Sequence, residues 1–449
     1  MTKDKSYQAV VRRVDVSCRK AKEMLSLWSK IPPPQRGRLV QAVGDKMSEH
    51  RKQLAAVIML ETGKTKEEAE GEVRSAIDMA YFIAGEGRRM YGDTTYSELP
   101  NRWALTKRYP IGVCAIIVPW NFPLSLMAWK VLPAILCGNT VVVKPSHHTP
   151  KTANVFKLLL DAAFIPDGVV NILYGDKEVG GELTENEHVR MVSFTGSTMS
   201  GRSIGETCAR RLIKCSLELG GKNAVIVMED ADLDLAVDAV VKGAFSFAGQ
   251  RCSATSRVIV HYSVYKTFLE KLYPAASRYP ARKVINGEQF KYITEAIEDT
   301  MRTHTALCGG KWNEKTLTIE PTIFSNVSCE DEIAAIEVFG PVLCVFEARS
   351  LEHAIGIHNK SEYGLSASVF TRDIGNALSA VDRLEAGVVY VNGPTFGAEV
   401  HLPFGGVKQS GNGSREVGKA AIDTFSELKT IYLDYSGVLQ NAQFRGKSR

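Results

Sequence analysis

The chain has 449 residues, of which 45% are apolar and 23% are charged, a balance typical of soluble globular proteins rather than of disordered or fibrous ones. A chain of this length is expected to form two or three domains. Its 55 Lys and Arg residues exceed its 50 Asp and Glu residues by only five, and the charges are scattered, which argues against a nucleic-acid-binding protein.

The N-terminus is polar and lacks the apolar segment of a secretory signal, and no apolar run reaches the roughly 18 residues that a membrane span needs. The nine cysteines include no CxxC pair and no Cys/His cluster with zinc spacing, so neither a disulfide framework nor a metal site is expected. We therefore expect a cytoplasmic protein with no metal and no membrane partner, in which one or two thiols at most are reactive.

Apolar residues at helical spacing predict helices over 15–30, 36–60 and 65–91, followed by an extended stretch over 94–113. From Val113 onward, apolar runs of strand length alternate with helical segments, which predicts a parallel sheet covered by helices on both faces. The strands predicted in this series are 113–118, 140–144, 169–173, 191–195 and 224–228, with helices over 124–137, 151–163 and 199–210.

A second series of the same kind begins near Leu233, and the chain closes with a predicted helix over 415–427 and a strand near 429–433. Its predicted elements are helices over 233–248, 264–274, 351–359 and 374–385 and strands over 256–261, 317–323, 342–347, 367–371 and 388–392. The fold class is therefore α/β, with two halves and a ligand cleft between them.

Cys252 ends the segment GQRC, in which Arg251 and nearby backbone N–H groups are expected to lower the pKa of the thiol. The alternative is a buried, inert thiol. Asn121 lies between two prolines in PWNFP, so a rigidly held amide there could donate to a developing oxyanion, although a stiff loop with no chemical role is the alternative.

Glu218 precedes two glycines in LELGGKN, where the backbone can approach a ligand closely and a lone carboxylate could be a general base. Gly196 and Ser197 follow a predicted strand and open a predicted helix, a geometry that suits a phosphate at the helix N-terminus. Lys144 ends an earlier strand in the segment KPS.

These motifs, together with EVFGPV at 337–342 and PFGGVKQSG at 403–411, occur in an order that resembles the NAD(P)-dependent aldehyde dehydrogenase superfamily over residues 15–435. The resemblance implies a Rossmann-type cofactor domain, an α/β catalytic domain and a small β oligomerisation arm. The expected ranges are 1–93 with 114–219, 220–412, and 94–113 with 428–440, respectively. The exposed strand edges of such an arm imply a homodimer or homotetramer.

The resemblance further implies that Cys252 attacks an aldehyde while the Asn121 amide and the Cys252 backbone N–H stabilise the oxyanion. Hydride then passes to the nicotinamide of NAD or NADP, and Glu218 activates the water that hydrolyses the thioester. Lys130 and Glu416 match a pair that relays protons from Glu218.

The resemblance also assigns ten residues to the cofactor: Pro119, Trp120, Lys144, Ser146, His147, Gly196, Ser197, Leu219, Glu337 and Phe339. Glu337 is expected at the nicotinamide ribose, with Phe339 packed beside it. His147 stands where NAD-preferring relatives often carry Glu, so the choice between NAD and NADP stays open.

Arg251, beside the nucleophile, and Arg74, on the helix expected to line the aldehyde tunnel, would suit a small aldehyde with a phosphate, phosphonate, sulfonate or carboxylate group. Phe122, Trp129 and Phe404 are expected to form an apolar tunnel wall. The alternatives are a neutral aldehyde, with Arg74 on a solvated helix face and Arg251 tuning the thiol, or an enzyme that passes the acyl group to coenzyme A.

Overall fold

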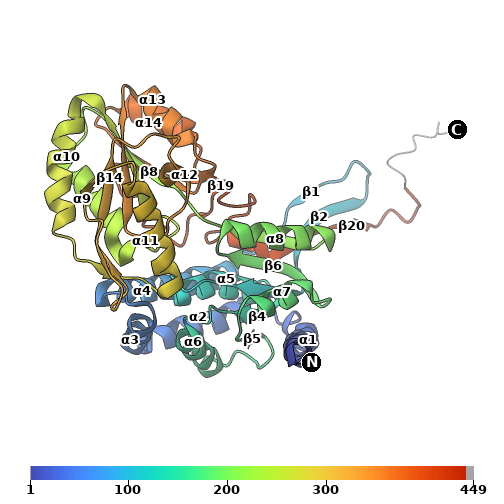
Figure 1. Cartoon of the computed structure of the whole chain (residues 1–449). Helices are drawn as coiled ribbons and strands as arrows, with labels where there is room; N and C mark the ends of the chain where they lie inside the picture. The colour runs from blue at the N-terminus through green and yellow to red at the C-terminus, as the bar shows by residue number, and fades with distance from the viewer. Residues whose placement is uncertain (1, 441–449) are drawn as a thin grey trace.

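The computed structural model of the protein describes residues 2–440 (Figure 1). A five-stranded sheet has the order β5-β4-β3-β6-β7, and all its pairs are parallel. Its strands are β3 (Val113–Ile117), β4 (Thr140–Lys144), β5 (Val170–Ile172), β6 (Val189–Thr195) and β7 (Lys214–Glu218).

Both faces of this sheet are buried. Along β3, Val113, Ala115 and Ile117 pack into the core on one face, whereas Cys114 and Ile116 pack into the core on the other. The first face is covered by α1 (Thr2–Trp28), α7 (Lys177–Glu185) and α8 (Thr198–Arg210). The second is covered by α2 (Pro33–Glu49), α3 (Arg51–Thr62), α4 (Lys66–Glu86), α5 (Pro123–Leu136) and α6 (Pro150–Ala162).

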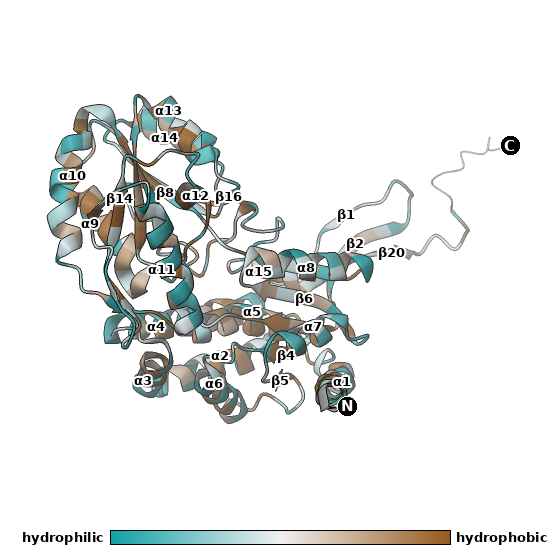
Figure 2. Cartoon of the chain, viewed as in Figure 1, coloured by the Kyte–Doolittle hydropathy of each residue, from teal (hydrophilic) through white to brown (hydrophobic). Residues whose placement is uncertain are grey.

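A seven-stranded sheet forms the second half, in the order β11-β14-β15-β9-β8-β17-β18, and all its pairs are parallel except that of the edge strand β11. Its strands are β8 (Asn223–Val227), β9 (Thr255–His261), β11 (Ala306–Cys308), β14 (Thr322–Ser325), β15 (Val342–Ala348), β17 (Ser366–Phe370) and β18 (Val388–Val391). The inner strands are strongly apolar (Figure 2), as expected for a sheet buried on both faces.

Helices also cover both faces of the seven-stranded sheet. One face carries α9 (Leu233–Phe245) and α10 (Tyr262–Ser277), and the other carries α11 (Gly287–Met301), α12 (Glu332–Ala335), α13 (Leu351–Asn359) and α14 (Ile374–Arg383). Two small sheets complete this half: β10 (Arg282–Lys283), β13 (Thr318–Ile319) and β12 (Trp312–Asn313), and β16 (Tyr363–Gly364) with β19 (Val407–Lys408).

A separate antiparallel sheet projects from the body of the molecule (Figure 1). It contains β1 (Thr94–Tyr96), β2 (Arg102–Pro110) and β20 (Ser426–Asp434), with β2 in the centre. In the described part of the chain, no helix combines the length and apolar character needed to cross a bilayer.

The α/β class predicted from the sequence is confirmed, but several elements differ. The predicted helix over 36–60 is two helices, broken at His50, and α7 and α11 were not predicted. The predicted closing helix over 415–427 is wrong at its start. Val417 and Gly418 have left-handed φ angles of 51° and 54°, so α15 spans only Ala420–Phe425.

Candidate active site

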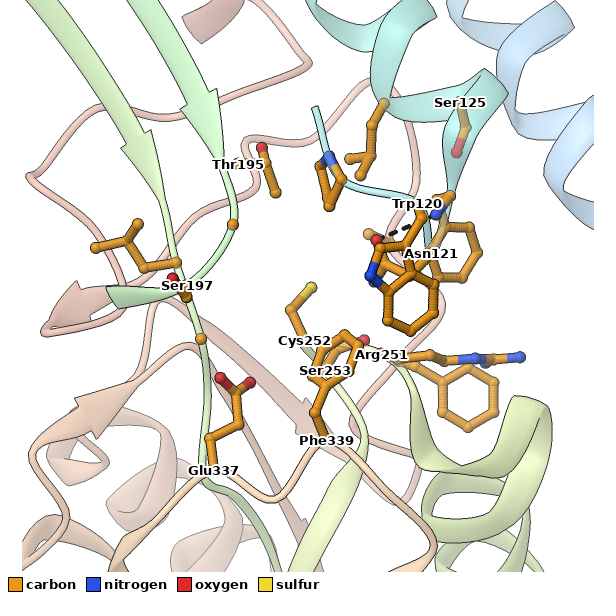
Figure 3. A pocket seen from close by; sticks show the side chains of 18 of the residues that line it. Trp120, Asn121, Ser125, Thr195, Ser197, Arg251, Cys252, Ser253, Glu337 and Phe339 are labelled. Carbon is orange, nitrogen blue, oxygen red and sulfur yellow. Dashed lines mark hydrogen bonds between the residues drawn. The ribbon is translucent and has the colours of Figure 1, made fainter. Parts of the chain in front are cut away.

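A cavity of about 990 Å³ lies where the two large sheets meet, and its walls come from loops that follow the strands (Figure 3). Most of the residues singled out in the sequence line it. These are Pro119, Trp120, Asn121, Phe122, Trp129, Gly196, Ser197, Leu219, Arg251, Cys252, Glu337, Phe339 and Phe404. Parallel strands present their carboxyl ends at one edge, which explains why motifs far apart in the chain converge.

Cys252 follows a tight turn, η1 (Ser246–Gly249), in which Phe247, Ala248 and Gly249 all have positive φ angles. Burial raises the pKa of the Cys252 thiol to about 12, and the Glu337 and Glu218 carboxylates add to this effect. The predicted lowering of the Cys252 pKa by Arg251 is therefore wrong for this state.

Burial outweighs any effect of the cation, and the Arg251 side chain points away from the sulfur (Figure 3). Its guanidinium carbon lies 4.9 Å from the ring centroid of Phe396 and 5.8 Å from that of Phe122. Arg251 is half-buried, and its Nε atom has no hydrogen-bond partner among the described residues. Burial lowers its pKa, and the nearby Glu68 carboxylate opposes this effect. Cation–π contacts with two aromatic rings thus help to hold a cation in the cavity wall.

The Asn121 amide is held against the Cys252 loop. Its Nδ2 atom donates to the carbonyl oxygen of Gln250 at 3.3 Å. The Gln250 side chain is itself fixed, because its Nε2 donates to the Phe247 carbonyl at 3.1 Å and its Oε1 accepts from the Ile285 N–H at 2.9 Å. An amide nitrogen carries two hydrogens, so Asn121 keeps a second N–H for a ligand.

Glu218, at the end of β7, is 3% exposed and lies behind the cavity wall rather than in the lining. Burial raises its pKa well above the usual value, the Glu416 carboxylate raises it further, and Lys130 opposes both. Neither Glu218 oxygen has a hydrogen-bond partner in the described chain. Lys130 and Glu416 form a buried ion pair nearby, and Lys130 also donates to the Ser193 hydroxyl at 3.1 Å.

Glu337 faces into the cavity near Cys252 (Figure 3), and its Oε1 accepts from the Gly221 N–H at 2.9 Å. Burial raises the pKa of Glu337 to about 7. The Phe339 and Trp120 rings meet edge to face, with 5.7 Å between centroids. Sequence reasoning missed that α11 holds this loop. Gln289 donates to the carbonyls of Val338 and Phe339 at 3.1 and 3.3 Å.

The start of α8 offers hydrogen-bond donors to a ligand in the cavity. Ser197 is the N-cap of α8 and accepts from the Ser200 N–H. The Thr195 and Thr198 hydroxyls are buried and have no partner among the described residues, and both residues line the cavity. A helix N-terminus flanked by unpartnered hydroxyls fits a phosphate group.

Lys144 lies at the end of β4 but lines neither this cavity nor the hollow next to it. It packs beside Gly180, its Nζ donates to the Pro145 carbonyl at 3.2 Å, and burial lowers its pKa. The hollow next to the main cavity has a volume of about 550 Å³ and is lined in part by Ser146, His147 and Trp120. His147 is exposed there.

Arg74 does not line the cavity, so its predicted place in an aldehyde tunnel is wrong. The face of α4 toward the cavity carries Gly71, Glu72 and Ser75, and Arg74 is exposed. Successive helical residues differ by about 100° in direction, so the neighbour of a lining residue points elsewhere. The predicted apolar wall is present, since the Trp129 and Phe404 rings meet edge to face at 5.7 Å.

Two buried charges near the site, Lys64 and Glu72, were also missed. They form an ion pair at 2.5 Å beside the Asn121 loop. The signal available in the sequence was weak, because charged residues on a helix usually face solvent. No three His, Cys, Asp or Glu side chains within residues 2–440 cluster closely enough to hold a metal ion.

The sequence matches the Aldehyde dehydrogenase family over residues 4–431, and the chain belongs to that family as an oxidoreductase that acts on aldehyde groups. It is 38% identical to the alpha-ketoglutaric semialdehyde dehydrogenase of Bacillus subtilis (92% of this chain, 88% of the relative). It is 39% identical to human retinaldehyde dehydrogenase 3 (90% and 82%). The betaine aldehyde dehydrogenase of Staphylococcus aureus, solved with NAD+, aligns with a TM-score of 0.91 at 33% identity (94% and 88%).

Proposed function

We propose that this enzyme oxidises an aldehyde to a carboxylic acid with NAD or NADP as the hydride acceptor. The observation that carries the proposal is the meeting of the Cys252 thiol and the Asn121 amide in one cavity, whose opposite wall holds Glu337 and the start of α8. Residues 1–93 and 114–219 would form the cofactor-binding part, and residues 220–412 the catalytic part.

The cavity fits the dinucleotide at several points. Ser197 and the first turn of α8 would hold the pyrophosphate, and the Glu337 carboxylate would accept hydrogen bonds from the nicotinamide ribose. Trp120 and Phe339 would pack beside the ring. When bound, NAD(P)+ would supply a hydride acceptor, and these residues would hold it in the cavity that Cys252 also lines.

Cys252 would attack the aldehyde carbon and give a thiohemiacetal. With a pKa of about 12, the resting thiol is protonated at neutral pH, so attack requires a base or a change in its surroundings. The Asn121 amide and the Cys252 backbone N–H would donate to the oxygen as it gains negative charge.

Glu218 would activate the water that hydrolyses the thioester. Burial and the Glu416 carboxylate raise its pKa, which makes it a stronger base than an exposed carboxylate, but its side chain must rotate to reach the cavity. In the observed position it faces the Lys130–Glu416 pair, which would carry the proton away. Transfer to coenzyme A would not need such a base, so Glu218 favours hydrolysis over an acyl-transferring enzyme.

We propose a small aldehyde with an anionic group as the substrate, recognised by Arg251. Within the described residues, the half-buried Arg251 guanidinium in the cavity wall forms no ion pair, and the Glu68 carboxylate in the same wall is paired with Arg282, which favours an anion beside Arg251 in the bound state. The relative from Bacillus subtilis is named for a semialdehyde, a substrate that carries a carboxylate. The human relative is named for the neutral retinaldehyde, which keeps neutral aldehydes as the alternative.

His147 bears on the choice between NAD and NADP, and the projecting sheet bears on the assembly of subunits. His147, exposed beside Ser146, adds no carboxylate of its own, but Glu288 and Glu295 line the same hollow, so the proposal covers both NAD and NADP. The sheet formed by β1, β2 and β20 would act as the arm of a homodimer or homotetramer. Its expected ranges, 94–113 and 428–440, include most of these strands.

The variant Glu218→Gln tests this mechanism. A burst of reduced cofactor equal to the number of active sites should be followed by turnover about 10²-fold slower or more, because hydride transfer survives and deacylation does not. Stopped-flow absorbance of the reduced cofactor measures both phases. Cys252→Ala is the matched control and should show neither burst nor turnover while it still binds cofactor. Equal loss of burst and turnover in Glu218→Gln would place Glu218 before hydride transfer instead.

A further inference from the structure

The corner between α3 and α4 places a buried lysine beside the Asn121 loop. Gly63, with a left-handed φ of 74°, ends α3, and Thr65 starts α4 with a capping box. Lys64 lies between them, and its side chain has no exposed surface. A buried ammonium group is costly unless its donors are paired, so its partners indicate what it does.

The Lys64 ammonium group makes its closest contacts with Glu72 and with the Asn121 loop, and it also lies 4.6 Å from the ring centroid of Phe247 in η1. Its Nζ donates to Glu72 Oε2 at 2.5 Å and to the carbonyl oxygen of Asn121 at 2.6 Å. It also lies 3.7 Å from the ring centroid of Phe122. Lys64 therefore holds residues 121 and 122 directly.

Glu72 holds the other end of the same loop. Its second oxygen accepts from the backbone N–H groups of Leu124 and Ser125 at 2.8 and 3.3 Å, in the first turn of α5. A buried ion pair often adds no stability relative to apolar side chains of the same size. Because the Lys64–Glu72 pair contacts both ends of the Asn121 loop, we expect it to fix the geometry of that loop rather than to stabilise the fold.

We propose that Lys64 and Glu72 are positioning residues that fix the Asn121 amide relative to the Cys252 sulfur. This inference rests on the proposed function, in which Asn121 donates to the oxyanion. Lys64 fixes the backbone of Asn121, and the Gln250 carbonyl fixes its side chain at 3.3 Å. Because both its backbone and its side chain are fixed, Asn121 presents its remaining amide N–H in one orientation. The donor then does not have to reorient as Cys252 attacks the aldehyde.

The double variant Lys64→Met/Glu72→Gln tests the proposal without leaving an unpaired buried charge. The glutamine oxygen can still accept from Leu124, so α5 should keep its start. With saturating aldehyde, the burst rate should fall about tenfold or more, since small misplacements of catalytic groups are costly. The alkylation of Cys252 by iodoacetamide, which needs no oxyanion donor, should change less than about twofold, as should the Kd for NAD+.

A double-mutant cycle with Asn121→Ala separates positioning from general damage. Alone, Asn121→Ala should lower the burst rate by ~10²–10³, the usual effect of losing one oxyanion donor. If the buried pair acts through Asn121, adding Lys64→Met/Glu72→Gln to that variant should cost less than about twofold more. If Lys64→Met/Glu72→Gln slows the burst by the same factor with and without Asn121→Ala, the proposal is wrong, whereas the role of Asn121 itself is unaffected.

The other outcomes are also decisive. If Asn121→Ala alone keeps the wild-type burst, the oxyanion assignment fails, and the inference fails with it. If the double variant slows iodoacetamide alkylation as much as the burst, the pair has a general structural role and the proposal is wrong. Lys66→Met is the matched control, because Lys66 is 76% exposed and its one ion pair within residues 2–440 is with Glu70, at 3.8 Å. It should keep the wild-type burst rate.

Discussion

At the scale of single residues, burial controls the charges of this site. Cys252, Glu218 and Glu337 all lie where the charged form is poorly solvated, and the pKa of each is raised. In the protein without ligand, burial therefore favours the neutral form of the Cys252 thiol and of both carboxyl groups. Ligands that donate hydrogen bonds or bring positive charge will shift these groups toward their reactive forms.

The raised pKa of Glu337 predicts that the affinity for the cofactor depends on pH. Ribose hydroxyls donate to a carboxylate better than to a carboxyl group, so cofactor binding favours the charged form and releases a proton below pH of about 7. The affinity for NAD+ should therefore rise by up to about tenfold per unit as pH increases from 5.5 to 7, and then level off. Titration calorimetry measures it, and Glu337→Gln should give weaker, pH-independent binding. A flat profile in the wild type would contradict this assignment.

Arg251 should determine the preference for anionic aldehydes. Charge-assisted hydrogen bonds are worth about 1.5–3 kcal/mol, so Arg251→Leu should lower kcat/KM for an anionic aldehyde by one to two powers of ten. A neutral aldehyde of equal length should lose far less. Arg74→Leu, on the exposed face of α4, is the control and should leave both values unchanged. If Arg251→Leu leaves the ratio unchanged, the enzyme oxidises neutral aldehydes instead.

At the scale of elements, the sequence predicts the strands well because their apolar runs are buried on both faces. It also places Asn121, Ser197 and Cys252 at strand or helix ends, where the structure brings them together. The sequence does not show which way the side chains of a helix point in the folded protein. Arg74 and Ser75 differ by one helical position, yet only Ser75 faces the cavity, because tertiary packing decides which way α4 is turned.

Two further features, the role of α11 and the environment of Glu218, could not be predicted from the sequence for the same physical reason. α11 carries Gln289, which holds the Phe339 loop, but its sequence has no landmark beyond an ordinary amphipathic pattern. The pKa of Glu218 depends in part on the Lys130 and Glu416 charges, which come from distant parts of the chain. Local patterns say where a side chain sits along the chain, whereas its rotamer and its pKa depend on partners far away in sequence.

The loop after β7 gives a prediction at this scale. A Cβ atom on Gly220 would lie 2.0 Å from Glu337 Oε2, so Gly220→Ala should push that carboxylate out of place. We expect the Kd for NAD+ to rise about tenfold or more, the cost of one displaced charge-assisted hydrogen bond. The thermal midpoint should change little, since the clash is with the end of a flexible side chain. Gly181→Ala, with open space around it, is the control. Unchanged NAD+ affinity would show that Glu337 does not bind the cofactor.

At the scale of the molecule, the cavity needs both halves, because one sheet supplies Asn121 and the start of α8 and the other supplies Cys252 and Glu337. The third sheet does not line the cavity. It projects from the body with β20 at one edge, so its outward backbone groups have no strand beside them in the described chain. Such an edge is a template for pairing with another copy.

The apolar face of this arm gives the last prediction. Tyr96, Trp103 and Leu433 are cross-strand neighbours on β1, β2 and β20, and they are 100%, 60% and 51% exposed. Cross-strand neighbours share one face of a sheet, so the three form a solvent-facing apolar row that association would bury. The wild type should sediment at a multiple of 49.3 kDa, and Trp103→Glu/Leu433→Glu should sediment at 49.3 kDa. Tyr262→Glu, equally exposed on α10 but remote from the arm, should keep the wild-type mass. A wild type of 49.3 kDa, or a double variant that keeps the larger mass, would show that this row does not hold copies of the chain together.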